Sequence, residues 1–266
     1  MEKYIYKIAT YNIRTDTHAD GAEGSRFRWS HRFSYIKKQI EINDWDILGI
    51  QETRQNQLDD FKSLSGCEVV GSKRSESRDA EYNPIIFKSD KFDLIETETS
   101  WLSPSGSKNS QAVEWKAAYP RIFTTAVLKE IKTGQTLTFI NTHFDHVSET
   151  ARYHSAQLIA KKLPRLKDRG PVFLMGDFNG GCSERWYKVI TNDFLDCETL
   201  APHKVGPDVS CTMSTLDSDP SWSDMSKIDY IFYDRDVEVL KTETLTDKFH
   251  GSYPSDHFPL SVKCLL

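Results

Sequence analysis

The sequence lacks the cysteine pattern of a disulfide-linked or thiolate-zinc protein. Its 266 residues include five cysteines, an odd number, spread along the chain without a C-x-x-C pair. Small secreted domains stabilised by disulfides use even numbers of cysteines, and structural zinc sites use closely spaced cysteine pairs. We therefore expect a reducing, cytoplasmic setting and no thiolate metal site.

Long apolar runs are also missing. No stretch approaches the roughly 18 consecutive apolar residues that a membrane-spanning helix needs. The N-terminal segment MEKYIYKIATYN carries charges and tyrosines where a signal peptide has an uninterrupted apolar stretch, and it is typical of a first strand. With 38% hydrophobic residues the chain can still form a substantial core. We expect no membrane association and a monomer.

Positive charge is not in excess. Lysine and arginine number 34 against 39 acidic residues, which gives a net charge of -5, and the densest cationic stretch, residues 26–38, is interleaved with aromatic residues. Proteins that bind long duplex DNA usually present a strongly basic face. The charge therefore does not favour extended duplexes, while short or single-stranded nucleic acids stay open.

The hydrophobic pattern predicts one mixed α/β domain over residues 1–266, without internal repeats or linkers. Apolar runs predict strands, and periodic patterns predict helices capped at Ser30 and Ser148. The expected strands are 4–13, 46–50, 67–71, 83–88, 92–102, 121–131, 135–143, 171–176, 228–233, 236–243 and 258–264. The expected helices are 30–44, 55–64, 148–163 and 183–192, with a loop over 201–226. Hairpin connections between several strands favour more antiparallel pairing than a doubly wound fold has.

Polar residues stand where many of these strands begin or end. Four follow strands and three precede them: Asn12, Glu52, His143 and Asp177, then Asp229, Asp256 and His257. In an antiparallel pair the end of one strand lies beside the start of its neighbour, so we expect these residues along one edge of the sheets. Acids gathered there would repel one another unless a cation lay among them. Oxygen ligands without a thiolate favour Mg²⁺, or Mn²⁺ in its place.

The pair His143-x-x-His146 raises the alternative of a zinc site. On an extended strand, residues three apart point to opposite faces. We therefore do not expect these two histidines to share a metal.

Seven short motifs occur in order along the chain: Tyr11-Asn12, Gln51-Glu52-Thr53, Glu81-Tyr82-Asn83, Asn141-Thr142-His143, Gly176-Asp177-Phe178-Asn179, Ile228-Asp229-Tyr230 and Ser255-Asp256-His257-Phe258-Pro259. Any one of them is unspecific. Together they make the sequence resemble the endonuclease/exonuclease/phosphatase superfamily, which includes DNase I, apurinic endonucleases and sphingomyelinases. The resemblance implies a DNase I-like four-layer α/β sandwich of two mixed sheets with helices outside.

The resemblance also implies roles for individual residues. Glu52 would be the main Mg²⁺ ligand, with Asn12 and Asp256 nearby, directly or through water. Asp177 and Asn179 would face the scissile phosphate and the attacking water.

The two histidines have implied roles as well. His257, oriented by Asp229, would act as a base or stabilise the phosphate. His143 would be the second imidazole and Glu81 its carboxylate partner, which would raise the imidazole pKa. Arg121 would bind phosphate.

Structural explanations exist for several of these residues. Asn12 could cap a turn, and Asp177 with Asn179 could form an Asx turn before the glycine pair. Arg121 and Glu81 could be solvated polar residues. Their joint occurrence at strand ends favours a site.

For two groups of residues, both a substrate-facing role and a packing role are compatible with the sequence. Trp29 and Arg32 could face substrate or pack at the start of a helix. Four tryptophans could either form an aromatic rim for a base or pack internally: Trp101, Trp115, Trp186 and Trp222. For Trp101, packing is the favoured interpretation.

The sequence thus predicts a Mg²⁺-dependent phosphoesterase that uses direct attack by water. Its substrate would be a nucleic acid or nucleotide, with a small phosphorylated metabolite or lipid headgroup as the alternative. An inactive scaffold of the same fold is the least favoured reading because the full set of site residues is present. The region after Glu81 lacks the glycine-rich stretch of apurinic endonucleases, which argues against DNA repair.

Overall fold

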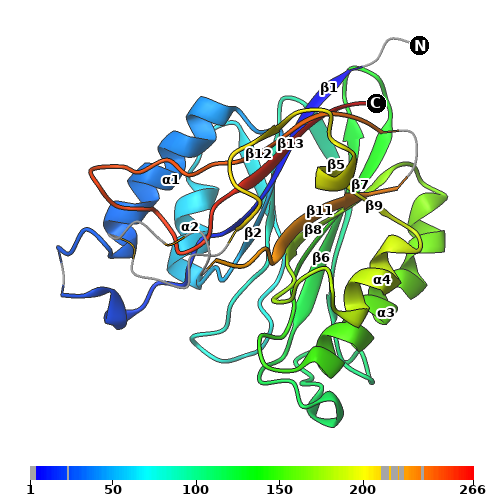
Figure 1. The fold of residues 1–266 in the computed structure, drawn as a ribbon, viewed down its shortest axis with the longest axis horizontal. Helices are drawn as coiled ribbons and strands as arrows, with labels where there is room; N and C mark the ends of the chain where they lie inside the picture. Colours follow the sequence, from blue (N-terminus) through cyan, green and yellow to red (C-terminus); the bar gives the residue numbers. More distant parts are fainter. Residues whose placement is uncertain (1–3, 23, 211–215, 217–220, 222–224, 235–236) are drawn as a thin grey trace.

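Two β-sheets pack face to face in the structure, a computed structural model that describes residues 4–22, 24–210, 216, 221, 225–234 and 237–266 (Figure 1). The first sheet has seven strands in the order β10 (Lys204–Val205), β12 (Glu238–Thr244), β13 (Leu260–Leu265), β1 (Ile5–Asn12), β2 (Ile47–Gln51), β4 (Ile85–Lys88) and β3 (Cys67–Val70). The second has six, in the order β5 (Phe92–Trp101), β6 (Ile122–Glu130), β7 (Thr136–His143), β8 (Val172–Asp177), β11 (Asp229–Tyr233) and β9 (Leu195–Asp196).

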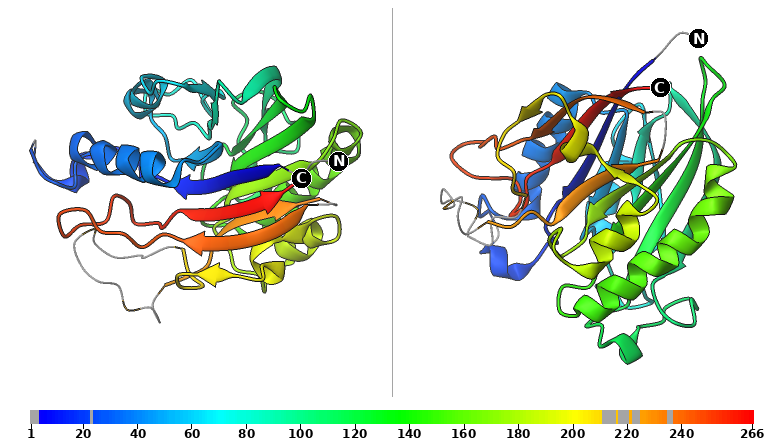
Figure 2. Two further views of the ribbon diagram at one scale, coloured as in Figure 1. Left: turned by 90° about the horizontal axis from the view of Figure 1, so that it is seen from above. Right: turned by 45° about the vertical axis from the view of Figure 1, so that its right-hand side comes forward.

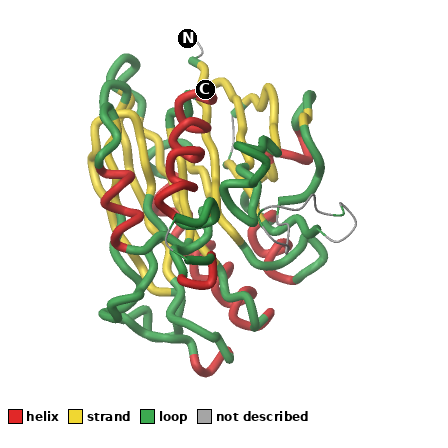
Figure 3. Tube along the Cα trace, turned by 90° about the vertical axis from the view of Figure 1, so that its left-hand side faces the viewer, coloured by secondary structure: helices red, strands yellow, loops and turns green. Residues whose placement is uncertain are grey.

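Helices cover the outer face of each sheet (Figures 1 and 3). The seven-stranded sheet is covered by α1 (Trp29–Asn43) and α2 (Gln55–Lys62), and the six-stranded sheet by α3 (Glu149–Lys167) and α4 (Arg185–Thr191). Shorter helical turns are η1 (His18–Asp20), η2 (Val113–Trp115) and α5 (Cys197–Leu200). The expected four-layer, DNase I-like sandwich is therefore confirmed.

The main core lies between the two sheets. Tyr6 and Ile47 of the first sheet and Phe139 and Phe173 of the second belong to one buried cluster. Two further clusters fill the space between each sheet and its helices. Strands buried on both faces explain why the sequence shows apolar runs rather than strict alternation.

The strand directions bring the predicted site residues to one edge of the sandwich. The strands β7 and β8 are parallel, so His143 lies opposite Asp177 at their ends, and β11 runs antiparallel to β8 with Asp229 opposite Asp177. The strand β1 runs parallel to β2 and antiparallel to β13, which places Asn12 at the end where β13 begins. The first and last strands start and finish near each other at the opposite edge (Figures 1 and 2).

A polar link joins the two sheets just behind this edge. Asn141 on β7 donates through Nδ2 to the carbonyl oxygens of Ile50 and Pro84, both at 2.8 Å, and its Oδ1 accepts from Gln51 Nε2 at 2.6 Å. A Cβ on Gly49 would lie only 2.9 Å from the Asn141 side chain, so glycine permits this approach. Gln51 and Asn141 belong to the motifs noted in the sequence, and their buried contacts set the position of one sheet against the other.

Part of the chain differs from the sequence prediction. The loop expected over 201–226 contains the two-residue strand β10, while Trp222 lies outside the described residues. The short elements β9 and α5 were missed because a few residues carry no periodicity. Within the described part of the chain, no helix has both the length and the apolar composition needed to span a membrane.

Candidate active site

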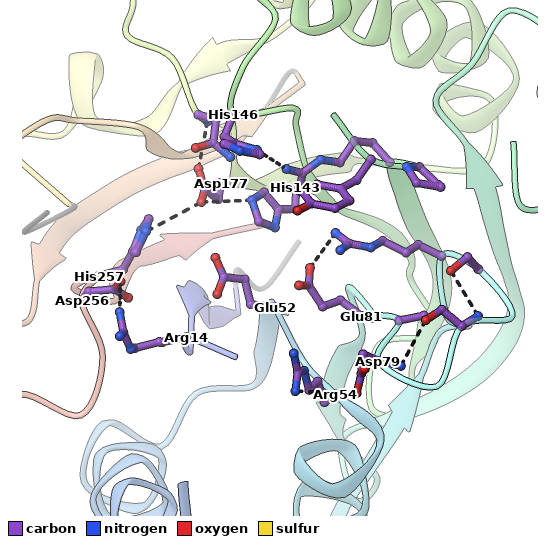
Figure 4. Close-up of a pocket in the computed structure, with 18 of the residues that line it drawn as sticks. Arg14, Glu52, Arg54, Asp79, Glu81, His143, His146, Asp177, Asp256 and His257 are labelled. Carbon is purple, nitrogen blue, oxygen red and sulfur yellow. Dashed lines mark hydrogen bonds and ion pairs between the residues drawn. The ribbon is translucent and has the colours of Figure 1, made fainter. Parts of the chain in front are cut away.

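A cavity of about 660 Å³ opens at the edge where the predicted residues meet (Figure 4). Eight of the ten predicted site residues line it: Glu52, Glu81, Arg121, His143, Asp177, Asn179, Asp256 and His257. The other two, Asn12 and Asp229, lie behind the wall and hydrogen-bond to residues that line it. The structure therefore gathers the whole predicted set in one place.

Asp177 lies at the centre of the polar contacts. Its Oδ1 accepts from the Asn179 backbone N–H at 2.8 Å, and its Oδ2 accepts from Asn12 Nδ2 at 2.9 Å. The same Oδ2 lies 3.5 Å from His143 Nε2 and 3.8 Å from His257 Nε2. Burial, with the negative charge of Asp229 next in size, raises the pKa of Asp177 to about 6. Such a carboxylate accepts a proton more readily than an exposed aspartate.

The backbone around Asp177 fixes its direction. Gly176 has φ +149°, and a Cβ there would lie 2.0 Å from the carbonyl oxygen of Thr142 on the neighbouring strand. Asn179 adopts a left-handed φ of 50° and donates through Nδ2 to the carbonyl of Phe144 at 3.0 Å. The Asx-turn reading is thus correct for the backbone, since Asp177 caps the turn, and the same carboxylate also lines the cavity.

His257 and Asp229 form a buried pair. His257 Nδ1 lies 2.7 Å from Asp229 Oδ2, which assigns the proton to Nδ1 and leaves Nε2 on the side of Asp177. The expected partnership of these two residues is therefore present. A carboxylate in this position orients the imidazole and stabilises its protonated form.

Glu52 and Asn12 bring a second carboxylate to the same centre. Asn12 Nδ2 donates to Glu52 Oε1 at 3.0 Å as well as to Asp177, and Glu52 Oε2 accepts from the Thr15 backbone N–H at 2.9 Å. Glu52 has φ 61°, an uncommon conformation for a residue other than glycine. Strain of this kind persists where the surroundings hold a side chain in a functional position. Figure 4 shows the Glu52 carboxylate pointing into the cavity.

Asp256 contacts an arginine that the sequence interpretation missed. Arg14 Nη1 donates to Asp256 Oδ2 at 2.7 Å, while its Nε and Nη2 donate to Asp20 Oδ1 at 3.1 and 2.8 Å. Burial opposes ionisation of Asp256, but His257 and Arg14 together lower its pKa. Arg14 also lines the cavity, so a fixed positive charge lies beside the predicted metal ligands.

The predicted partnership of Glu81 with His143 is wrong. Glu81 Oε2 lies 2.7 Å from Arg74 Nη1, whereas His143 Nδ1 has no hydrogen-bond partner within the described chain. The pKa of His143 is lowered well below its usual value, first by burial and then by the charges of Arg121 and Arg74. His143 is thus a neutral imidazole near pH 7, and the nearby carboxylate at its Nε2 is Asp177.

Arg121 contacts both His146 and Asp145. Its Nη2 lies 3.0 Å from His146 Nδ1, and its Nε lies 3.5 Å from Asp145 Oδ2. His143 and His146 both line the cavity because the strand ends at His143, so the alternation that separates residues three apart does not extend to His146. The premise that residues three apart point to opposite faces therefore does not apply to this pair, although the contact of His146 Nδ1 is with Arg121.

Arg32 and most of the described tryptophans are buried packing residues rather than substrate-facing ones. Arg32 is fully buried and donates to the carbonyls of Ile13 and Pro254 at 2.6 and 2.9 Å, so it ties the segment of Arg14 to the segment of Asp256. Trp29 is in the core, Trp101 is buried on β5, and Trp186 is fully buried on α4. Trp115 stacks on His154 away from the cavity residues. The aromatic-rim interpretation is wrong for Trp186, which packs under the six-stranded sheet.

The residues present fit a hard divalent cation. Asp177, Asp229 and His257 offer ligand atoms within 4.8 Å of one another, and Glu52 joins Asp177 through the shared Asn12 amide. Burial and the charge of the neighbouring Asp229 raise the pKa of Asp177, so a cation beside these two carboxylates would favour their ionised forms. Carboxylate and amide oxygens are ligands of hard divalent cations, and no thiolate is among the described residues that line the cavity.

Known proteins of similar sequence and fold place this chain in a family. A structure of an endonuclease/exonuclease/phosphatase from Bacteroides vulgatus is 30% identical, covers 98% of both chains and has a TM-score of 0.90. A mannosyl-6-phosphatase from Bacteroides thetaiotaomicron is also 30% identical, covers 98% of this chain and 100% of that one, and has a TM-score of 0.89. The human nocturnin catalytic domain, at 16% identity over 99% and 96% of the two chains with a TM-score of 0.75, shares the fold.

Curated protein sequences give no significant match. The model of the Endonuclease/Exonuclease/phosphatase family matches residues 9–257, a range that spans every predicted site residue. With its strand-end carboxylates, its His257–Asp229 pair and its fold, the chain belongs to the endonuclease/exonuclease/phosphatase family and is a hydrolase of phosphoester bonds.

Proposed function

We propose that this protein is a Mg²⁺-dependent phosphomonoesterase whose substrate is a small, hydroxyl-rich phosphorylated molecule of the sugar phosphate type. This choice takes up the alternative of a small phosphorylated metabolite rather than the first expectation of a nucleic acid or nucleotide. The main support for this choice is that Arg74 and Arg121 line the cavity together with His143.

Both guanidinium groups act on the same imidazole, since each lowers the pKa of His143. Arg74 has little exposed surface, is held by Glu81, and stacks over Tyr119 with its Cζ 4.9 Å from the ring centroid. A phosphomonoester carries a second negative charge that a diester lacks. Two fixed guanidinium groups beside a neutral imidazole suit that extra charge, because planar guanidinium groups bind phosphate oxygens well.

The similarity to the mannosyl-6-phosphatase supports the same class of substrate. The cavity wall also supplies a carboxylate and a hydroxyl, Asp79 and Ser77, at the end opposite Asp177. Such groups pair with sugar hydroxyls, which both donate and accept hydrogen bonds.

Several residues of the cavity have separate roles in the proposed hydrolysis. Asp177, with its raised pKa, orients the attacking water and accepts its proton. His257, held by Asp229, donates from Nε2 to the phosphate when its imidazole is protonated, and Asn179 lines the cavity as well. His143 remains neutral and fills the position between Asp177 and the two arginines. The leaving alkoxide takes a proton from solvent in the open cavity.

A bound Mg²⁺ would neutralise charge on the non-bridging phosphate oxygens. Glu52 is the proposed direct ligand, with Asn12 and Asp256 contributing through water. Mn²⁺, which accepts the same donor set, is expected to substitute.

A second candidate is a nucleotide or a short single-stranded nucleic acid. Tyr119 lines the cavity, its side chain is about half exposed, and His146 stacks on it with centroids 5.9 Å apart. An exposed aromatic ring of this kind can stack on a base. Among the described lining residues, however, Tyr119 is the one phenyl, phenol or indole side chain, which makes a run of stacked bases a poorer fit.

The deciding experiment compares monoesters with diesters. Sugar phosphates, nucleotides, single-stranded DNA and RNA, plasmid and phospholipid headgroups would be assayed with Mg²⁺, Mn²⁺ or EDTA. The Arg74→Ala variant should lose far more kcat/KM on p-nitrophenyl phosphate than on bis(p-nitrophenyl) phosphate. Equal losses on both esters, or a wild-type protein that prefers diesters, would contradict the monoesterase proposal. Activity that survives EDTA would contradict the metal requirement.

The cytoplasmic setting, the monomeric state and the single catalytic domain over residues 1–266 also remain proposals. The cysteines within the described chain are all free, which is in keeping with a reducing compartment. Cell fractionation and light scattering of the purified protein would test the first two.

A further inference from the structure

A second cavity adjoins the catalytic one. It measures about 570 Å³, and four of its lining residues also line the catalytic cavity: Arg54, Ser77, Asp79 and Ala80. Figure 4 shows Arg54 and Asp79 at the opposite end of the catalytic cavity from Asp177 and His146. A substrate whose phosphate lies near Asp177 would therefore direct its leaving group toward this shared boundary.

A weak ion pair between Arg54 and Asp79 lies at the boundary between the two cavities. Arg54 Nη1 and Asp79 Oδ1 are 3.8 Å apart, and the Asp79 side chain is 72% exposed. Exposed ion pairs of this length contribute little to stability. In addition, Arg54 Nε has no hydrogen-bond partner within the described chain. A ligand that crosses the boundary can replace this contact with its own hydrogen bonds at small cost.

The wall of the second cavity that is formed at the start of α2 carries hydrogen-bonded polar side chains. Gln55 at the start of α2 accepts from Tyr82 Oη at 2.5 Å and donates through Nε2 to Asp59 Oδ1 at 2.8 Å. Asn56 Nδ2 donates to Asp16 Oδ2 at 2.9 Å. These contacts place amide and carboxylate groups beside one another, so the wall offers both donors and acceptors.

The charges on this wall exclude some ligands. The second cavity is lined by three acidic and three basic residues, so the two signs are balanced: Asp16, Asp59, Asp79, Arg54, Lys73 and Arg78. A polyanionic strand gains little from a wall of mixed sign, whereas a neutral ring with several hydroxyls can both donate to the carboxylates and accept from the amides. Tyr82 adds one aromatic ring for an apolar sugar face.

We propose that the second cavity is a leaving-group subsite that binds a neutral sugar unit linked to the phosphorylated one, so that the preferred substrate is a phosphorylated oligosaccharide rather than a free sugar phosphate. This inference rests on the proposed function and specifies its substrate. The phosphorylated ring occupies the catalytic cavity, and the next ring crosses the Arg54–Asp79 boundary to contact Gln55, Asn56 and Tyr82.

The test compares a hexose 6-phosphate with a disaccharide that carries the same phosphorylated ring at its non-reducing end. Wild-type kcat/KM should be at least about tenfold higher for the disaccharide, since each additional net hydrogen bond contributes several-fold to affinity. Asn56→Ala and Tyr82→Ala should each remove about three- to tenfold of that advantage and leave the monosaccharide value unchanged. Asn192→Ala, an exposed asparagine at the end of α4, serves as the matched control and should change neither value.

The outcomes separate the two proposals. Hydrolysis of both sugar phosphates at equal kcat/KM would overturn the subsite and leave the monoesterase function intact. A disaccharide preference that Asn56→Ala and Tyr82→Ala do not reduce would also overturn it, since the second ring would then lie elsewhere. Failure to hydrolyse either compound, with turnover of another phosphoester, would overturn the proposed function and the subsite together. Thermal unfolding of each variant establishes that it is folded.

Discussion

Arg14 Nη1 lies 2.7 Å from Asp256 Oδ2, so a carboxylate predicted to serve a metal ion is already paired with a guanidinium group. The Arg14 backbone N–H also donates to Asn12 Oδ1 at 3.0 Å. Arg14 thus contacts both residues that were predicted to lie beside Glu52 at the metal, Asp256 and Asn12. The head of Arg14 is held in turn by buried Asp20, and Arg32 fixes its carbonyl. Arg14 therefore supplies a permanent positive charge on one side of the site and leaves the side of Glu52 and Asp177 for a divalent cation.

Removing this charge should strengthen metal binding. A unit charge a few ångströms from a divalent ion opposes its binding, so Arg14→Ala should tighten Mn²⁺ binding on the order of tenfold in titration calorimetry. The same variant should lose kcat, because Asp256 is no longer held in place. Arg28→Ala removes an arginine from the neighbouring loop, where it contacts Thr17 and Asp16, and should leave the Mn²⁺ affinity unchanged. Weaker Mn²⁺ binding by Arg14→Ala would show instead that Arg14 organises the ligands.

The raised pKa of Asp177 predicts a pH dependence of stability in the metal-free protein. The folded state retains a proton on Asp177 up to about pH 6, while the unfolded chain releases it near pH 3.8. The free energy of unfolding should therefore fall as the pH rises through this window, because the unfolded state binds fewer protons there.

Asp177→Asn removes this titration and tests the sign. The Tm of the wild type relative to the variant should decrease between pH 4 and pH 7 in EDTA, by an amount corresponding to about 2 kcal/mol. Saturating Mg²⁺ should raise the Tm of both proteins, because the variant keeps the proposed ligand Glu52. A Tm difference that stays constant with pH would mean that Asp177 titrates normally.

The sequence predicted the residues of this site better than their contacts. Asp177, Asp229 and His257 follow or precede buried strands, and strand order alone brings such positions to one edge. Arg14, Arg74 and Glu81 lie in segments without periodicity, where the direction of a side chain depends on loop geometry. The partner of Glu81 was accordingly predicted wrongly. The burial of Trp186 was undecided for a related reason, because a helix as short as α4 shows too few turns to define its buried face.

The Asp229–His257 pair should be essential for turnover but not for folding. Asp229→Asn keeps the shape of the side chain yet cannot stabilise a protonated imidazole, so kcat should fall on the order of 100-fold or more. Asp234→Asn is a matched control on the same part of the chain, since Asp234 is equally buried just beyond the other end of β11 and accepts from the Val172 backbone N–H. That variant should lose stability and keep its kcat. Comparable losses of kcat in both variants would show that the effect of Asp229 is structural.

Gly176 should be required to hold Asp177 at the end of β8. Its φ of +149° and the 2.0 Å approach of a Cβ to Thr142 O leave no room for a side chain, because β7 and β8 are paired along this segment. Gly176→Ala should therefore lower the free energy of unfolding by at least about 2 kcal/mol and displace Asp177, with a loss of kcat greater than the loss of stability explains. Gly181→Ala lies a few residues away, meets no atom within 4 Å and should be neutral in both measurements. Chemical denaturation and steady-state kinetics on the two variants give the comparison, and a fully active Gly176→Ala protein would show that the position of Asp177 does not depend on this backbone contact.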